Sequence, residues 1–305
     1  MAFTAADVKK LREMTSVGMM DCKKALTETD GDMDKAVEYL REKGLAKAAK
    51  KAGRIAAEGV SYALVENGVG ALVEVNCETD FCAKSAPFVA FVKDIAKVVA
   101  DNDPADVDAL MNCKYPGTEL TVSETMPEKV MSIGENLQIR RFVRFAENTS
   151  VGYVHAGGKI GVLVDVETDV INDAIKEMAR NVAMQAAALK PLYTSEAEVD
   201  ADYIEKEKEI LTAAAKNEKP DANEKIINGM VMGRIKKELK EICLLDQVYV
   251  KAEDGKQSVG AYVASVAKAN NANITIKKFV RFETGEGIEK KEENFAEEVA
   301  KQMGM

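Results

Sequence analysis

The 305-residue sequence contains no tryptophan and only one histidine, His155. A site that needs two imidazoles is therefore excluded, and histidine-based acid/base chemistry has one candidate. The five cysteines form no CxxC pair and are odd in number, which favours reduced thiols in a cytosol over a disulfide framework or a zinc site. We expect no metal-centred catalysis and no bound cofactor.

Long apolar runs are also missing. No stretch approaches the roughly 18 residues needed to span a bilayer, and the start, MAFTAADVKK, resembles neither a signal peptide nor a transit peptide. We therefore expect a cytoplasmic protein that does not bind membranes. The composition, with 47% apolar and 30% charged residues, is typical of a soluble globular protein. The length predicts two domains, or three if one is small.

The net charge of −9 is unevenly distributed along the chain. Residues 1–54 carry twelve Lys/Arg against nine Asp/Glu, so the remainder is strongly acidic. An acidic body repels phosphates, and we expect no direct nucleic acid binding. The basic stretch KGLAKAAKKAGR (43–54) is most simply a solvated helical linker, although it could also touch an acidic surface.

The first 42 residues have the pattern of three short helices. Thr4 is a candidate N-cap, Gly18 separates the first two helices, and Gly44 is expected to end the third. We predict that residues 1–54 form a three-helix bundle followed by the basic linker. Its small core comprises Val8, Leu11, Cys22, Leu26, Val37 and Leu40.

After the linker the apolar period changes from 3.6 to 2. Asn67-Gly68 separates two alternating runs, which is a strong signal for a β-hairpin with a type I′ turn. An amphipathic helix begins near Ser85, and LQIRRFVRF (137–145) predicts a third strand. These elements form a predicted first core subdomain over residues 55–148. The apolar face of its helix comprises Phe88, Phe91, Val92, Ile95 and Val99.

The same order of elements then recurs. GVLVDVETD (161–169) repeats ALVEVNCETD (71–80), and IKKFVRFETGEG (276–287) repeats IRRFVRFAEN (139–148), with a hairpin turn again expected at Gly157-Gly158. The offset grows from 91 to 137 residues, so the second copy holds an insertion of about 46 residues. We predict a duplicated α+β fold with antiparallel sheets, its second core subdomain spanning residues 149–287.

The insertion has the pattern of two helices separated by Pro220. Apolar residues at steps of four in the second helix, from Ile227 to Leu239, predict a coiled-coil-like helical hairpin arm at about 200–241. A last amphipathic helix, EENFAEEVAKQM (292–303), forms a predicted C-terminal module over residues 288–305.

The common signatures of enzymes are absent. We find no GxxxxGK(S/T), no GxGxxG after a strand, no GxSxG and no HExxH. We therefore expect neither an enzyme nor a small-molecule substrate, although an unrecognised site stays open. Repeated sheets, an arm and an appended helical module suit extended contact with another protein. An adaptor that binds partners through its ends is the alternative to any more specific activity.

The most specific residues are Thr79, Asp80 and Phe81, which follow the second strand in EVNCETDFCAK (74–84). Phe81 is either a core residue under the next helix or a side chain at the rim of the sheet. The repeat favours the rim, because the equivalent position holds Val170. Asp80 is matched by Asp169, which favours a helix-capping role for both carboxylates.

Two segments resemble signatures of the bacterial elongation factor Ts family, namely LREMTSVGMMDCKKAL (11–26) and EVNCETDFCAK (74–84). Ser16-Val17 and Cys82 depart from the usual Gly-Ala and Val of that family. The resemblance implies a ubiquitin-associated-like bundle, two core subdomains and a helical arm. It also implies guanine nucleotide exchange: proteins of this family bind the GDP form of the GTPase elongation factor Tu and promote release of GDP and Mg²⁺.

The resemblance also implies roles for individual residues. Phe81 would wedge beside the magnesium-binding region of the GTPase, with Asp80 orienting that contact. Further contacts would come from the first signature and from two loops of the core, at Arg12, Met19, Met20, Ile133, Gly134 and His155. Without the resemblance, Met19 or Met20 is simply a core residue of the bundle. Adjacent residues on a helix cannot both point inward, so one of the two is expected to be exposed. A local hydrogen bond explains His155.

Overall fold

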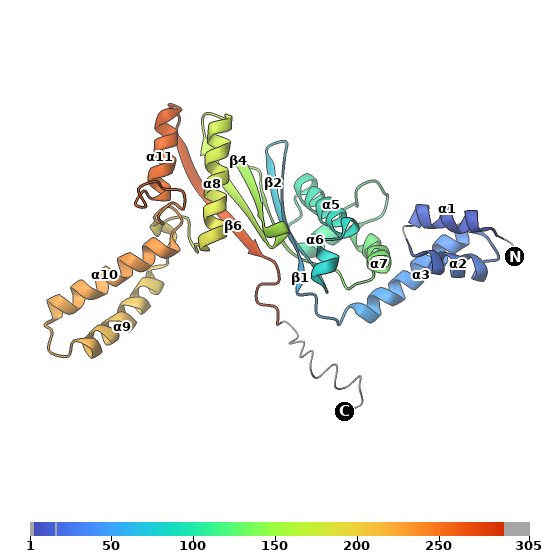
Figure 1. Cartoon of the computed structure of the whole chain (residues 1–305), viewed down its shortest axis with the longest axis horizontal. Helices are drawn as coiled ribbons and strands as arrows, with labels where there is room; N and C mark the ends of the chain where they lie inside the picture. Colours follow the sequence, from blue (N-terminus) through green and yellow to red (C-terminus); the bar gives the residue numbers. More distant parts are fainter. Residues whose placement is uncertain (1–2, 16, 290–305) are drawn as a thin grey trace.

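The computed structural model describes residues 3–15 and 17–289. Within them it has eleven α-helices and two three-stranded antiparallel sheets, which confirms the α+β class. Figure 1 shows an elongated molecule with a helical bundle at one end and a helical arm at the other. The predicted C-terminal helix lies outside the described residues. None of the described helices is long and apolar enough to cross a membrane.

The bundle consists of α1 (Ala5–Thr15), α2 (Met19–Glu28) and α3 (Met33–Lys51). Thr4 caps α1 as predicted, since its Oγ1 accepts a hydrogen bond from the Asp7 backbone N–H at 3.3 Å. The buried core includes every predicted residue except Val37, which is partly buried against it. The three predicted helices are thus confirmed.

The prediction that Gly44 ends the third helix is wrong, because α3 continues through the basic stretch to Lys51. Gly44 lies where α3 crosses α7 (Val122–Ile133), and a Cβ there would lie 3.3 Å from the carbonyl oxygen of Pro127. The glycine therefore permits a close approach of two helices rather than a chain reversal. The basic stretch is helical, as expected of a linker, but it is also packed against the first core unit.

The first sheet contains β1 (Glu58–Glu66), β2 (Val69–Cys77) and β3 (Gln138–Phe145), in that order. Asn67 and Gly68 have φ values of 53° and 82°, which confirms the predicted tight turn. Helices α4 (Asp80–Ala83), α5 (Ala86–Asn102) and α6 (Val107–Met111) lie between β2 and α7. The whole predicted apolar face of α5 is buried.

The second sheet contains β4 (Thr149–His155), β5 (Ile160–Thr168) and β6 (Ile274–Glu283). Gly157 and Gly158 lie in the turn with positive φ, within the short 3-10 segment η1 (Ala156–Gly158). Helix α8 (Asp173–Leu189) follows β5, as α5 follows β2. The remaining elements before β6 are η2 (Glu196–Glu198), the two arm helices and α11 (Val259–Ala269).

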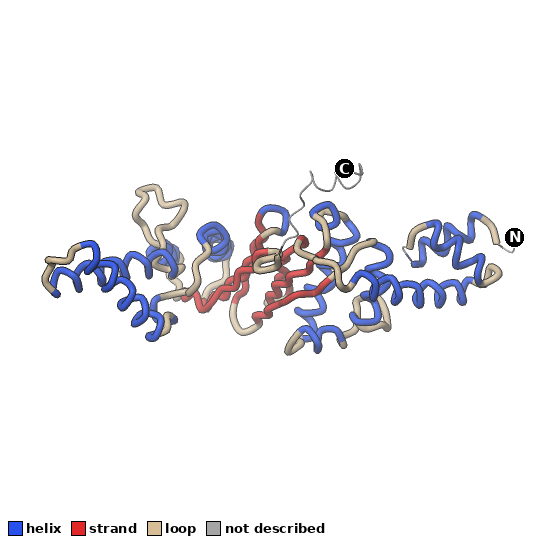
Figure 2. The backbone as a smooth tube through the Cα atoms, turned by 90° about the horizontal axis from the view of Figure 1, so that it is seen from below, coloured by secondary structure: helices blue, strands red, loops and turns tan. Residues whose placement is uncertain are grey.

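The two sheets are copies of one unit. Each central strand carries a register shift against its third strand, between Glu74 and Val75 in one and between Asp165 and Val166 in the other, 91 positions later. The sheets pack on each other through Leu72, Phe145, Leu163 and Phe282, which are equivalent in pairs. Figure 2 shows the strands of both sheets gathered in the middle of the molecule.

The arm is formed by α9 (Ala201–Glu218) and α10 (Glu224–Ile242). Ile227, Val231 and Ile235 of α10 are buried against α9, as their spacing predicted. Tyr203 and Glu238 join the two helices through a 2.5 Å hydrogen bond. Figure 1 shows the arm projecting from the second sheet unit. The subdomain boundaries given above stay predictions.

Candidate functional site

The segment after β2 is shaped by Thr79. Its Oγ1 accepts a hydrogen bond from the Cys82 N–H at 3.1 Å, so Thr79 is the N-cap of α4. The interpretation of Asp80 as a cap is therefore wrong. Asp80 instead forms an exposed ion pair with Lys84, with Nζ and Oδ2 2.6 Å apart. The hydrogen bond and charge of Lys84 lower the pKa of Asp80, and Lys159 adds to this effect.

Phe81 projects from the first turn of α4 into solvent. It is 82% exposed, the highest value among the exposed large apolar residues of the described chain. The interpretation of Phe81 as a core residue is thus wrong. The apolar contacts of α4 with the core come from Cys82 and Ala83. A large aromatic side chain left in water on a capped turn is available for contact with another molecule.

Glu135 holds the backbone of this segment in place. Its carboxylate accepts hydrogen bonds from the N–H groups of Glu78 and Thr79, at 2.9 and 3.0 Å, and from the Thr79 hydroxyl at 2.6 Å. In return, Oε1 of Glu78 accepts from the Asn136 N–H at 2.6 Å. These bonds join the Thr79–Phe81 segment to the loop that follows α7. They restrict the directions in which Phe81 can point.

Sequence reasoning missed Glu135, because it lies 56 positions from Thr79 and belongs to no local motif. The only sequence signal was its position next to the predicted pair Ile133-Gly134. Ile133 is half-buried against the first core, and Gly134 caps the C-terminus of α7 with a φ of 91°. The Gly134 carbonyl accepts a hydrogen bond from Lys51, so the end of α3 also reaches this loop.

His155 lies at the end of β4 and is exposed. Its Nδ1 shares a 2.8 Å hydrogen bond with the Tyr153 hydroxyl, as the simpler interpretation expected. The following loop packs against β1, where a Cβ on Gly158 would lie 2.8 Å from Val60. Lys159, which follows this loop, contributes to the lowered pKa of Asp80.

Arg12, Met19 and Met20 lie on the bundle and all three are exposed. Met19 is 52% exposed and Met20 76%, so neither packs in the core. Figure 1 shows the bundle separated from α4 by the second half of α3. The structure therefore brings Thr79, Asp80, Phe81, Ile133 and Gly134 together, but it places the bundle residues elsewhere. A single molecule that contacts both regions must be large.

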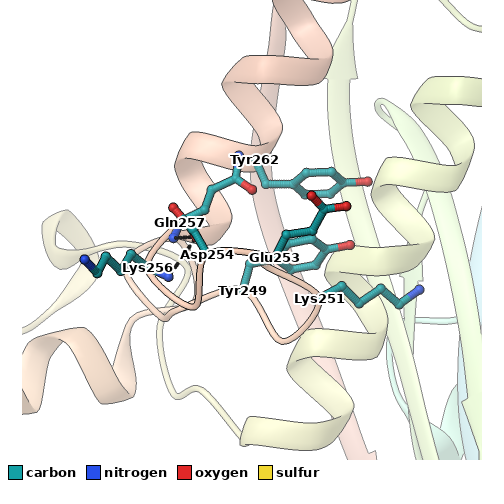
Figure 3. Close-up of a pocket in the computed structure, with 7 residues that line it drawn as sticks. All are labelled: Tyr249, Lys251, Glu253, Asp254, Lys256, Gln257 and Tyr262. Atoms are coloured by element: carbon teal, nitrogen blue, oxygen red, sulfur yellow. Dashed lines mark hydrogen bonds between the residues drawn. The ribbon is translucent and has the colours of Figure 1, made fainter.

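One open cavity of about 600 Å³ lies on the second unit, far from these residues in the chain. Figure 3 shows its lining, in which the rings of Tyr249 and Tyr262 stack at 4.2 Å between centroids. Asp254 accepts hydrogen bonds from the N–H groups of Lys256 and Gln257 and so closes its own loop. The cavity contains none of the predicted site residues, and its tyrosines serve as packing.

Comparisons with known proteins agree over nearly the whole chain. The sequence matches the family described as "Elongation factor TS" over residues 78–286. It is 53% identical to an elongation factor Ts from Clostridium botulinum (strain Eklund 17B / Type B), over 99% of both chains. Similar proteins from Clostridium perfringens (strain SM101) and Clostridioides difficile (strain 630) are 53% and 52% identical. Coverage of both chains is 99% for the former and 98% for the latter.

Proposed function

The chain belongs to the elongation factor Ts family, and on that premise we propose that it is a guanine nucleotide exchange factor for translation elongation factor Tu. It binds the GDP form of that GTPase and promotes the release of GDP and Mg²⁺, so that GTP can enter the empty site. No bond is made or broken on this chain, so the role is that of a binding protein and not of an enzyme.

The observation that carries the proposal is Phe81, which is 82% exposed on a segment clamped by Glu135. An apolar side chain on a backbone segment that is already ordered avoids the cost of ordering that segment when it enters a partner. Phe81 is thus suited to insert beside the magnesium-binding region of the GTPase. Asp80, exposed next to it, is suited to orient the contact through its charge.

Exchange follows from linkage between two ligands of one GTPase. A protein that binds the GTPase more tightly when the nucleotide site is disarranged lowers the affinity of the GTPase for nucleotide. By linkage, bound nucleotide lowers the affinity of the GTPase for that protein by the same factor. Weakening GDP a thousandfold requires about 4 kcal/mol of coupling. A few buried anchors supply free energies of this size, and Phe81 is the first candidate among them.

The other predicted contacts extend the surface. Met19 and Met20 offer exposed, adaptable apolar side chains on the bundle, and His155 lies at the tip of the second sheet. Arg12 adds an exposed positive charge on α1 of the same bundle. Contact at these separate places would orient the GTPase against Phe81. It would also add area that a single side chain cannot provide.

The test is the release of a fluorescent GDP analogue from purified elongation factor Tu, with and without this protein. We expect release to accelerate with the concentration of the protein and to saturate. Binding without any acceleration would contradict exchange and support the adaptor alternative. Absence of binding would contradict both.

A further inference from the structure

Two thiols and a carboxylate meet directly beneath the Phe81 segment. Cys77 is the last residue of β2, Cys82 lies in α4, and Glu135 reaches in from the loop after α7. The two Sγ atoms and a carboxylate oxygen of Glu135 all lie within 4.8 Å of one another. The two cysteines are close in the sequence, whereas the fold brings in Glu135 from a distant loop.

Packing explains the thiols, and hydrogen bonds explain the position of Glu135, but neither requires the three groups to meet. Cys77 is fully buried and Cys82 is 4% exposed, as is common for cysteines that serve as small apolar residues. The Glu135 carboxylate accepts three hydrogen bonds from Glu78 and Thr79 and also lies within 4.8 Å of both thiols. The Cys77 thiol donates a hydrogen bond to the Thr79 carbonyl at 3.3 Å. Three potential ligand atoms this close together fit around a single cation.

We propose that Cys77, Cys82 and Glu135 bind a thiophilic divalent cation of the zinc class, with a water molecule as fourth ligand. Zinc binds cysteine sulfur at about 2.3 Å and carboxylate oxygen at about 2.0–2.2 Å in tetrahedral geometry. Two sulfur ligands of one such ion lie about 3.8 Å apart, so the observed cluster needs only a small contraction.

The donor set selects the ion. Two thiolates favour zinc and similar soft cations, whereas Mg²⁺ and Ca²⁺ prefer sites made only of oxygen. Four residues separate the cysteines, a spacing found in structural zinc sites. The expectation of no metal site rested on the absence of CxxC, and it could not anticipate a third ligand 53 positions after Cys82. This proposal replaces that expectation.

Binding of an ion at this site would also affect the position of Phe81. The Glu135 oxygens already accept hydrogen bonds from Glu78 and Thr79. An ion that binds one of these oxygens would therefore weaken the hydrogen bonds that hold the segment. Phe81 lies between Thr79 and Cys82 and would change direction with them. This consequence rests on the proposed exchange function, whereas the binding of the ion does not.

The test uses the full chain, reduced and treated with a chelator, and titrates it with Cd²⁺ as a spectroscopic probe for zinc. We expect thiolate-to-cadmium charge-transfer absorption that saturates at one ion per chain, and native mass spectrometry with Zn²⁺ should show the same stoichiometry. Cys82→Val, which replaces the thiol with an apolar side chain that is slightly larger and cannot bind metal, should abolish the band. Glu135→Gln should weaken binding by at least about tenfold, the loss typical even for outer partners of metal ligands.

Cys113→Ser is the matched control, because Cys113 is half-buried, its Sγ donates to the Ala109 carbonyl, and it does not belong to the proposed ligand set. It should bind like the unsubstituted chain. Absence of both the band and the one-to-one zinc adduct in the unsubstituted chain overturns the proposal without relying on any variant. A band that survives in a folded Cys82→Val protein also overturns it. So does formation of a Cys77–Cys82 disulfide with a mild disulfide oxidant in a chain that takes up no ion.

Discussion

The Phe81→Ala variant distinguishes two roles of Phe81, that of an anchor in the contact with the GTPase and that of a core residue. A fully buried phenylalanine contributes about 1.5–3 kcal/mol through burial. Phe81 is 82% exposed, so it obtains only a fifth of this, about 0.3–0.6 kcal/mol. The free energy of unfolding should therefore change by less than 1 kcal/mol.

The effect on exchange should be much larger. If the exposed part of Phe81 becomes buried in the GTPase, the same scale gives about 1.2–2.5 kcal/mol of lost interaction. This corresponds to a loss of roughly 10–70-fold in acceleration at subsaturating protein. Phe81→Ala should thus retain its fold and lose most of its effect on GDP release.

The matched control is Phe88→Ala, seven residues further along. Phe88 is fully buried in the first core, and its truncation should destabilise the chain by about 3–5 kcal/mol. Thermal unfolding and release of fluorescent GDP are to be measured on both variants. Normal exchange by Phe81→Ala would refute the anchor. A loss of stability similar to that of Phe88→Ala would refute the reasoning from exposure.

Three further predictions concern the bundle, the crossing after β6 and the arm. Met20→Ala should leave the melting temperature nearly unchanged, because Met20 is 76% exposed, but it should slow GDP release if the bundle contacts the GTPase. Gly285→Ala should destabilise the chain in urea unfolding far more than Gly287→Ala. Both have positive φ, which costs about 1–2 kcal/mol, but only at Gly285 would a Cβ collide with the Ala57 carbonyl, at 2.0 Å. The hydrogen bond to Glu238 raises the pKa of Tyr203 to about 12. The stabilisation of the arm by this hydrogen bond should therefore be present below about pH 10 and be lost as the pH rises towards 12. Hydrogen exchange of α9 measures this loss, and the Tyr203→Phe variant should not show it.

Elements with a strong local signal were predictable from the sequence. The Asn67-Gly68 turn, the buried face of α5 and the repeat offset each depend on residues close together in the chain. The T-x-x-E capping box at Thr121 and Glu124 could have revealed α7 in the same way, although the prediction omits that helix. The helix α11 is likewise missing from it.

Features that depend on distant contacts were not predictable. Gly44 has the local appearance of a helix end, and only the approach of Pro127, 83 positions later, makes it a packing position. Glu135 has no sequence signal beyond its position next to Ile133-Gly134, and its role appears only when the fold brings it to Thr79. The candidate site was therefore found by its exposed residues, while the residue that holds it in place was not.

The duplicated loops show why only one copy carries the exposed aromatic on a clamped turn. In the second copy Asp169 itself ties the loop down, by accepting hydrogen bonds from the N–H and Nδ2 of Asn273 at 2.8 and 2.7 Å. In the first copy that task falls to Glu135, from outside the loop. Asp80 is thereby free to lie in solvent beside Phe81. The two copies thus hold the same loop with carboxylates from different places in the chain, Asp169 from within the loop in one and Glu135 from outside it in the other.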